Sequence, residues 1–283
     1  MFRIVLKKNL SVVNKLMEIE APLIARKAQP GQFIILRTRE TGERIPLTIA
    51  DSSKENGTIT IIFQELGKTT KELGRMEIGE SLHDFVGPLG TPMELPPPGW
   101  RAIVVGGGIG IAPIYPKVKA LKRAGLDVVS IIGARRADLL ILEEEMRAVS
   151  SELYICTDDG SKGHHGLVSD PLLPMLEDKS KKIDEIIAVG PLPMMRSIAN
   201  LTKPFGVKTY VSLNPIMVDG TGMCGCCRVT VGGETKFSCV DGPIFDGHMV
   251  DFEELDRRFK TYLVEEKLSR EKFEHECKCG GGK

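Results

Sequence analysis

The sequence predicts a β-barrel joined to a doubly wound, parallel α/β sheet, with a small cysteine-rich C-terminal subdomain. Up to about residue 95, short segments rich in Ile, Val, Thr and Phe alternate with Gly, Pro or Asn, which is typical of antiparallel strands. Beyond residue 100, continuous apolar segments alternate with amphipathic ones, which indicates parallel strands connected by helices. The chain of 283 residues has room for about two domains of roughly 100–200 residues each.

The expected barrel strands are, in order, FRIVLKKNL, VNKLMEIEA, GQFIILRT, RIPLTIAD and GTITIIFQEL. The run LPPPGW at 95–100 follows them. Its three consecutive prolines can continue neither a helix nor a central strand, so we expect it to link the two domains. The resulting divisions are 1–97 for the barrel, 98–212 for the α/β domain, 213–245 for the cysteine-rich segment and 246–283 for a terminal helix and tail.

The α/β domain is expected to contain four strand–turn–helix units and a last strand. The units are RAIVVGGGIGIAPIYPKVKALKRAG, LDVVSIIGARRADLLILEEEMRAV, ELYICTDDG and DEIIAVGPLPMMRSIANLTKPFG, and the last strand is VKTYVSL. After the cysteines, Phe252, Leu255, Phe259 and Leu263 recur at spacings of three and four. This spacing predicts one amphipathic helix, with an apolar stripe that packs either on its own sheet or on a partner.

The segment VVGGGIG places glycines, among them Gly107, Gly108 and Gly110, where a strand ends and a helix begins. Residues without side chains let backbone amides approach a pyrophosphate, and a helix N-terminus favours its negative charge. The dinucleotide fingerprint is incomplete, because Ile111 or Pro113 stands at its last glycine position and the second strand ends IIGARR without an acidic residue. The alternative is a tight turn without a ligand. Two more strand ends, TDDG at 157–160 and GPLPMM at 190–195, fall at the same expected edge and favour a pocket there.

The segment NPIMVDGTGMCGCCRVTVGGETKFSC, residues 214–239, contains four of the seven cysteines. No stretch has the ~18–20 apolar residues of a membrane span and the N-terminus is unlike a signal peptide, so we expect a cytoplasmic protein. In that reducing compartment clustered cysteines indicate a metal or redox site rather than disulfides. With 38 basic and 38 acidic residues, nothing favours nucleic-acid binding.

The spacing of the cysteine segment matches the plant-type [2Fe–2S] pattern of C-x4-C-x2-C and a distant cysteine, with aspartate in the first place. The predicted ligands are Asp219, Cys224, Cys227 and Cys239. The hairpin CRVTVGGETKFSC has a Gly-Gly turn that returns its last cysteine beside its first. Ferric iron accepts oxygen donors, so the aspartate is a plausible ligand.

Two alternatives to this ligand set remain open. Cys226 competes for the fourth position, although it adjoins Cys227 and its side chain should point the other way. A zinc ribbon would need a second cysteine pair, for which only Cys277 and Cys279 in the terminal tail are available. Elsewhere, Cys156 is expected to be a buried neighbour of the nucleotide pocket.

Several motifs, in this order from about residue 2 to 245, resemble the ferredoxin–NADP reductase superfamily: RIPLTIAD, GKTTKEL, VGPLGTP, GGGIGIAP, TDDGSKGHHGLVSD and VGPLPMM. Within it the chain is similar to the electron-transfer subunits of dihydroorotate dehydrogenase and to the small subunits of NADH-dependent reduced ferredoxin:NADP oxidoreductases, which are also described as sulfide dehydrogenase subunits. The resemblance implies FAD in the barrel, a nicotinamide dinucleotide on the α/β sheet and a [2Fe–2S] cluster in the cysteine segment.

The resemblance also implies site residues. The flavin ring would contact Pro46, Leu47 and Thr48, with Thr48 near flavin N5 as the candidate catalytic residue. The ribityl or adenine part would contact Ile62, Phe63 and Gln64, and the pyrophosphate Gly67, Thr69 and Thr70. Taken singly, Thr69 and Thr70 could equally cap a helix. Arg44 precedes Thr48 by four positions rather than the usual three, which weakens its assignment as a phosphate ligand.

For the dinucleotide, the resemblance implies Gly107, Gly108, Gly110, Asp158, Gly160, Gly190 and Met194. Arg135 and Arg136, after the second strand, could pair with a 2′-phosphate and favour NADP(H), but the resemblance favours NAD(H).

These parts imply an electron-transfer enzyme without an acid–base pair. A nicotinamide delivers two electrons as hydride, and a flavin can release them singly to an iron–sulfur centre. Because the sequence contains no acceptor for the cluster, we expect a heterodimer with a large flavoprotein subunit. The resemblance implies an electron-bifurcating complex that couples NADH, NADPH and, through the complex, ferredoxin. The alternatives are the electron-transfer subunit of an NAD-dependent dihydroorotate dehydrogenase and a non-redox zinc-binding module.

Overall fold

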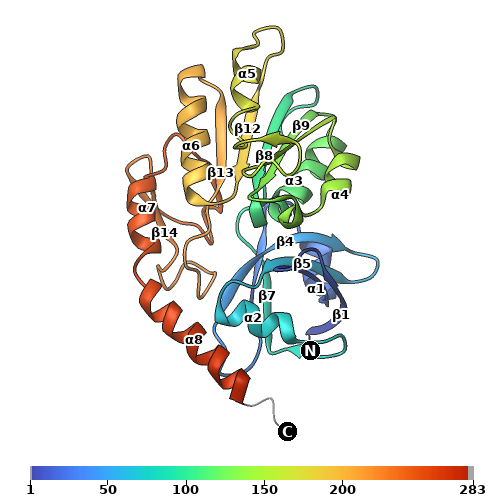
Figure 1. Cartoon of the computed structure of the whole chain (residues 1–283), viewed down its shortest axis with the longest axis vertical. Coiled ribbons are helices and arrows are strands. Elements are labelled where there is room, and N and C mark those ends of the chain that lie inside the picture. Colours follow the sequence, from blue (N-terminus) through green and yellow to red (C-terminus); the bar gives the residue numbers. More distant parts are fainter. Residues whose placement is uncertain (1, 280–283) are drawn as a thin grey trace.

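The computed structural model describes residues 2–279, with side chains up to residue 275. Its N-terminal part is a seven-stranded antiparallel sheet with the order β6-β1-β2-β5-β4-β3-β7. The strands are β1 (Phe2–Asn9), β2 (Asn14–Glu20), β3 (Phe33–Arg37), β4 (Ile45–Ser53), β5 (Thr58–Gln64), β6 (Ser81–Leu82) and β7 (Asp84–Leu89). Because His83 alone joins the two end strands, the sheet curls into a nearly closed barrel (Figure 1).

The predicted barrel is confirmed, and β1 to β5 are the five expected strands. The strands alternate because one side faces the barrel core: in β5, Ile59, Ile61 and Phe63 lie in that core, whereas Ile62 packs outward against the second domain. Two short helices cover the barrel, α1 (Pro22–Lys27) and α2 (Lys68–Arg75). The sequence analysis did not identify β6, β7 or α1.

The second sheet has the order β11-β10-β9-β8-β12-β13-β16, and all its pairs are parallel except β13 with β16. Its strands are β8 (Arg101–Gly107), β9 (Asp127–Ala134), β10 (Glu152–Thr157), β11 (His164–His165), β12 (Glu185–Val189), β13 (Lys208–Ser212) and β16 (Ile244–Asp246). After β8 the chain adds β9, β10 and β11 on one side of that strand, and it then places β12 on the other side. The switch point of this doubly wound sheet therefore lies between β8 and β12.

Helices cover both faces of this sheet, as predicted. One face packs against α3 (Ile111–Arg123) and α4 (Glu143–Val149), in a core that also includes Ala50 and Ile62 of the barrel. The other face packs against α5 (Leu172–Glu177), α6 (Leu192–Thr202) and α7 (Phe252–Phe259). The shared core fixes the barrel against the carboxyl edge of β8. Within residues 2–279, no helix is both long and apolar enough to span a bilayer.

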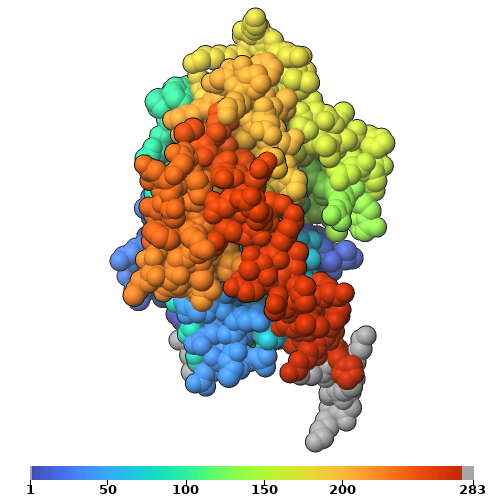
Figure 2. Space-filling view, turned by 90° about the vertical axis from the view of Figure 1, so that its left-hand side faces the viewer, coloured from blue at the N-terminus to red at the C-terminus, as the bar shows by residue number. Residues whose placement is uncertain are grey.

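The cysteine segment leaves the sheet after β13 and returns to it at β16. Its hairpin consists of β14 (Arg228–Val231) and β15 (Glu234–Phe237), joined by Gly232 and Gly233, both with positive φ, as the predicted Gly-Gly turn requires. At the base of the segment, the Leu213 amide donates to the Pro243 carbonyl at 2.9 Å. Figure 2 shows the C-terminal part of the chain, from orange to red, covering one face from the α/β domain to the barrel.

The prediction of a single terminal helix is wrong, because the structure has two helices there, α7 and α8 (Leu263–Cys279). Phe252 and Leu255 are buried against the sheet, but Leu263, the last residue of the predicted stripe, is exposed. α8 leaves the sheet and extends to α2 (Figure 1). There, Arg75 lies 4.7 Å above the Phe273 ring. Phe259 also packs against this core, so three of the four residues of the stripe pack on the protein's own sheet.

Candidate functional site

The glycine turn at the end of β8 lies directly against the end of β12. A Cβ at Gly107 would lie 2.3 Å from Met194 Sδ, and one at Gly110 would lie 2.2 Å from the Val189 carbonyl oxygen. Gly108 has φ +57 and open space where a side chain would be. Two of the glycines are thus needed for packing, and the third leaves one side of the turn open to a ligand.

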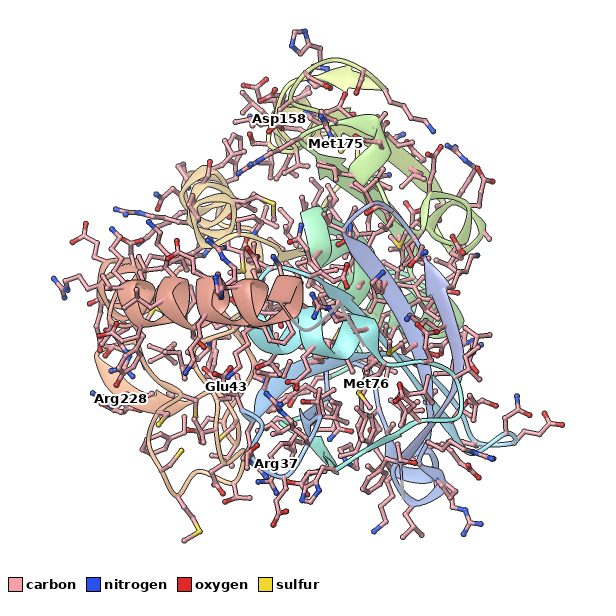
Figure 3. The ribbon with its side chains drawn as sticks, turned by 60° about the horizontal axis from the view of Figure 1, so that its bottom comes forward. Arg37, Glu43, Met76, Asp158, Met175 and Arg228 are labelled. Carbon is pink, nitrogen blue, oxygen red and sulfur yellow. The ribbon has the colours of Figure 1, made fainter. Side chains whose placement is uncertain are left out.

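The loops after β9 and β10 lie side by side at the same edge of the sheet. The Asp158 amide donates to the Ala134 carbonyl, and the Asp159 amide donates to the Arg135 carbonyl, each at 3.2 Å. The side chains of Arg135 and Asp158, the second of which is labelled in Figure 3, are exposed. Neither has an ion pair or hydrogen bond with a residue that the structure describes. Arg136 pairs with Asp138 instead.

The predicted nucleotide residues therefore gather at the carboxyl edge of the parallel sheet. Gly190 and Gly107 both contact Met194, and Gly160, with φ +73, adjoins the His165 ring. Cys156 is buried beneath this edge, and burial raises the pKa of its thiol to about 11. At neutral pH it is a neutral side chain of the core rather than a thiolate.

The predicted flavin residues lie on the part of the barrel next to this edge. Pro46, Leu47 and Thr48 are half-buried on β4, and the Thr48 hydroxyl has no hydrogen bond within the described part of the chain. Phe63 is only 1% exposed in the barrel core, so its side chain cannot line a flavin pocket and only its backbone remains for that role. Gln64 is half-buried at the end of the same strand.

At the N-terminus of α2, the helix-capping role that was open for both threonines is found for Thr70. Thr70 Oγ1 accepts from the Gly67 amide at 3.1 Å, which caps the helix. The Thr69 hydroxyl donates to the Glu43 carboxylate at 2.6 Å (Figure 3). The space beside Gly67 is open, so the pyrophosphate role of this turn stays a prediction.

The hairpin brings the two buried cysteines together, as predicted. Cys227 and Cys239 Sγ atoms are 3.2 Å apart, and burial raises the pKa of Cys239 to about 12. Cys224 is exposed, and hydrogen bonds from the backbone of Cys226 and then Asp219 lower its pKa. Asp219 Oδ2 accepts from the Thr221 amide at 2.9 Å and from the Thr221 hydroxyl.

Among the described residues, no group of three His, Cys, Asp or Glu side chains is arranged to hold a metal ion. The donor set nevertheless fits an iron–sulfur group, because two thiols are already adjacent and two further donors, Cys224 and Asp219, lie in the glycine-containing loop beside them. The Cys226 thiol contacts that of Cys224 rather than pointing away from the site, so it stays a competitor for the fourth position. The side chains of Cys277 and Cys279 lie outside the described residues.

The buried thiols share a small core with the barrel. Cys227 and Cys239 pack with Phe33 and Ile35 of β3, which are paired in register with Thr48 and Pro46 of β4. The cysteine segment therefore lies on the outer side of the strand adjacent to the predicted flavin strand.

Sequence analysis missed two arginines at this segment. Arg44, which the family pattern suggested as a phosphate ligand, donates instead to the Val218 carbonyl at 2.7 Å, and Arg258 of α7 donates to the Cys226 carbonyl at 2.9 Å. No local motif identifies these contacts, since they join residues that are 174 and 32 positions apart.

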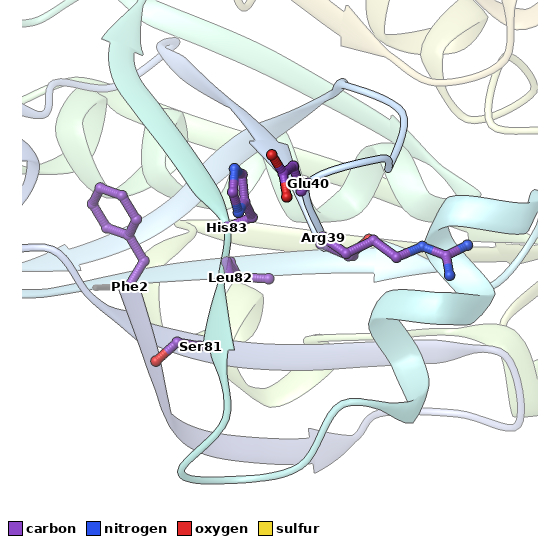
Figure 4. Close-up of a pocket in the computed structure, with 7 residues that line it drawn as sticks. Phe2, Arg39, Glu40, Ser81, Leu82 and His83 are labelled. Atoms are coloured by element: carbon purple, nitrogen blue, oxygen red, sulfur yellow. The ribbon is translucent and has the colours of Figure 1, made fainter.

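Two cavities of the structure lie away from the predicted site. One of about 520 Å³, at the end of the barrel, is lined by Phe2, Thr38, Arg39, Glu40, Ser81, Leu82 and His83 (Figure 4). Another of about 300 Å³, between the barrel and the second half of α3, includes Asp51, Lys54, Lys119 and Arg123. Neither contains a predicted flavin, nucleotide or iron ligand.

Two family models match the chain. Residues 214–251 match the iron-sulfur cluster binding domain of dihydroorotate dehydrogenase B, and residues 104–200 match the oxidoreductase NAD-binding domain. The first match agrees with the donor set of the cysteine segment and disfavours the zinc alternative.

Relatives match over most of their length. The chain is 48% identical over 255 residues to a Thermotoga maritima homologue of the dihydroorotate dehydrogenase B (NAD(+)) electron transfer subunit, covering 90% of this chain and 89% of the relative. It is 37% identical over 231 residues to the Bacillus caldolyticus electron transfer subunit, covering 79% and 87%. A chain in a solved structure of an NADH-dependent reduced ferredoxin-NADP oxidoreductase is 44% identical, with a TM-score of 0.91, covering 96% and 98%.

Proposed function

Since the chain belongs to the family of dihydroorotate dehydrogenase B electron-transfer subunits and their homologues, we propose that it is the electron-transfer subunit of an NADH-dependent reduced ferredoxin:NADP oxidoreductase. In this role it passes electrons between NAD(H), FAD and a [2Fe–2S] cluster, and on to a large flavoprotein subunit. The complex is electron-bifurcating and cytoplasmic.

The observation that carries this proposal is the shared core of the cysteine segment and the barrel. Cys227 and Cys239 contact Phe33 and Ile35, and these two residues pair with Thr48 and Pro46 on the flavin strand. Direct cross-strand partners project from the same face of a sheet, so the two predicted redox groups lie over adjacent strands. FAD bound by this strand would supply a group that can take up hydride from a nicotinamide and give up single electrons to an iron–sulfur centre.

The residues of the chain bind and orient these groups. Gly108 leaves its side of the turn open to the dinucleotide, and the exposed Arg135 and Asp158 lie at the neighbouring strand ends. Thr48 offers a hydroxyl that has no protein partner for a hydrogen bond to the flavin ring. Asp219, Cys224, Cys227 and Cys239 hold the cluster. No acid–base pair is required, because hydride and single electrons move without one.

The large subunit is proposed to dock over the cysteine segment. Met223, between two of the proposed ligands, is 87% exposed, and Val218 and Val240 are also exposed there. Leu263 and Val264 at the start of α8 add to the exposed apolar side chains. A docked partner would cover these residues and shorten the path of the electron out of the cluster.

Cofactor analysis tests the proposal. Anaerobically purified protein should contain about one FAD, two iron atoms and two acid-labile sulfides per chain, as a single [2Fe–2S] centre requires. Colourless protein that contains zinc and no flavin would instead support the non-redox module.

The second candidate is the electron-transfer subunit of an NAD-dependent dihydroorotate dehydrogenase, which the match of residues 214–251 favours. Isolation of the native complex and identification of its large subunit distinguish the two. A dihydroorotate dehydrogenase as the partner would replace our proposal, whereas a larger flavin and iron–sulfur protein would support it.

A further inference from the structure

Two arginines hold the loop that carries the proposed cluster ligands, and each does so at an equivalent place. Arg44 Nε donates to the Val218 carbonyl at 2.7 Å, and Arg258 Nη2 donates to the Cys226 carbonyl at 2.9 Å. Each carbonyl belongs to the residue immediately before a proposed ligand, Asp219 in one case and Cys227 in the other. The orientation of both ligand residues is therefore coupled to a guanidinium group.

The two arginines come from different domains. Arg44 immediately precedes β4 of the barrel, and Asp84 of β7 holds it at 3.4 Å, while Arg37 pairs with the same carboxylate at 2.7 Å. Arg258 lies on α7, which packs on the α/β sheet. The ligand loop is thus fixed from both sides, and its position relative to the barrel depends on Arg44.

The surroundings of both guanidinium groups limit screening by water. The Arg44 side chain is 29% exposed and its charge is only partly balanced, since Asp84 also pairs with Arg37. Arg258 is half-buried, and its Nε is buried without a hydrogen-bond partner in the described part of the chain. A positive charge in such a place favours the more negative, reduced form of a neighbouring redox centre.

We propose that Arg44 and Arg258 are positioning residues that orient the ligand loop between the two domains and raise the reduction potential of the cluster. The proposal rests on the proposed iron–sulfur function. The two main-chain hydrogen bonds set the geometry of the loop, and the two positive charges make the cluster a better electron acceptor.

Three charge-removing variants test the proposal: Arg44→Gln, Arg258→Gln and, as the matched control, Arg257→Gln. Glutamine retains a hydrogen-bond donor and removes the charge. Arg257 neighbours Arg258 on α7 but is exposed to solvent. The measurement is a redox titration of the cluster, followed by electron paramagnetic resonance, in protein with verified iron and sulfide content.

At the wild-type midpoint we expect a ratio of reduced to oxidised cluster about tenfold lower in each of the first two variants, equivalent to ~59 mV for a one-electron couple, and no change in Arg257→Gln. Unchanged potentials in loaded Arg44→Gln and Arg258→Gln would overturn the inference. If a glutamine variant loses its cluster, the corresponding lysine variant decides. A lysine variant with the wild-type cluster content and reduction potential supports the inference. If the lysine variant also loses the cluster, restoring the positive charge does not restore the site, and the proposed effect of the charge is overturned.

The wild-type protein separates this inference from the proposed function. Absence of iron and sulfide from anaerobically prepared wild type refutes the iron–sulfur function itself, and the inference with it. A loaded wild type with insensitive variants refutes only the inference. In protein without the cluster, Arg44→Ala should also speed hydrogen exchange of the amides in 218–226, and unchanged exchange would exclude a role of Arg44 in holding the loop.

Discussion

Replacement of Gly110 by alanine should impair the use of NADH while the protein keeps its FAD and iron. The added Cβ would lie 2.2 Å from the Val189 carbonyl oxygen and 2.7 Å from its carbonyl carbon. Ordinary contact begins at 3.4 Å, so the turn or the end of β12 must move by about 1.2 Å, the difference between 3.4 and 2.2 Å. Because both sides are backbone, no side-chain rotation relieves the clash.

The expected cost has two parts. Overpacking of this kind lowers the free energy of unfolding by ~1–3 kcal/mol. A misplacement of about 1 Å at a binding turn can also lower a reaction rate by ~10²-fold. We therefore expect kcat/KM for NADH-driven flavin reduction to fall about 10- to 100-fold, with FAD and iron content unchanged, in stopped-flow measurements on loaded protein.

A matched variant defines what would refute this reasoning. In Gly107→Ala the obstacle is the flexible Met194 side chain, so Met194→Ala should restore its melting temperature but not that of Gly110→Ala. Wild-type kinetics in Gly110→Ala would show that the close contact of the turn with β12 does not position the nucleotide. Equal rescue of both variants by Met194→Ala would show that the clash is not with the backbone.

Three further predictions concern single side chains. Burial raises the pKa of Glu185 from 4.5 to about 7, so ionisation of this carboxyl opposes folding. The destabilisation is absent below pH 4.5 and grows between pH 4.5 and pH 7. Above pH 7 it stays at up to ~3 kcal/mol. Glu185→Gln should therefore raise the melting temperature at pH 8 but not at pH 4.5, and an equal effect at both pH values would contradict the assignment. Asp219→Ala should lose or destabilise the cluster in iron analysis and visible spectra while Cys226→Ser retains it, and the reverse result would make Cys226 the fourth ligand. Arg135→Ala should leave the KM for NADH within about twofold if NAD(H) is the substrate, whereas a preference for NADPH in the wild type that this variant abolishes would identify NADP(H).

The strands and the glycine turn were predictable because their signals are local. Alternation identified β1 to β5, and two adjacent glycines identified the turn between β14 and β15. β16 has only three residues and is a strand because β13 offers a free edge, so its own sequence carries little signal. The break between α7 and α8 was missed because the apolar spacing continues to Leu263, where no part of the sheet remains to cover it.

The site was predicted as a set of positions but not as a set of contacts. The spacing of the cysteines predicted the approach of Cys227 and Cys239, since a tight hairpin determines it. Spacing could not predict that Phe63 faces the barrel core, that Glu43 reaches Thr69, or that Arg44 reaches Val218. These contacts depend on how distant elements pack, and only the folded chain brings them together.

The hydrogen bond between Leu213 and Pro243 closes the base of the cysteine segment within one sheet. Both ends of the segment are anchored on neighbouring strands, β13 and β16, so the thirty or so residues between them form a cassette with adjacent endpoints. The segment can lengthen or shorten without moving β13 and β16, but its contacts with Phe33, Ile35 and Arg44 tie it to the barrel as well. In the proposed function, the electron outlet is therefore an insertion between two strands of the nucleotide domain that the flavin domain also holds in place.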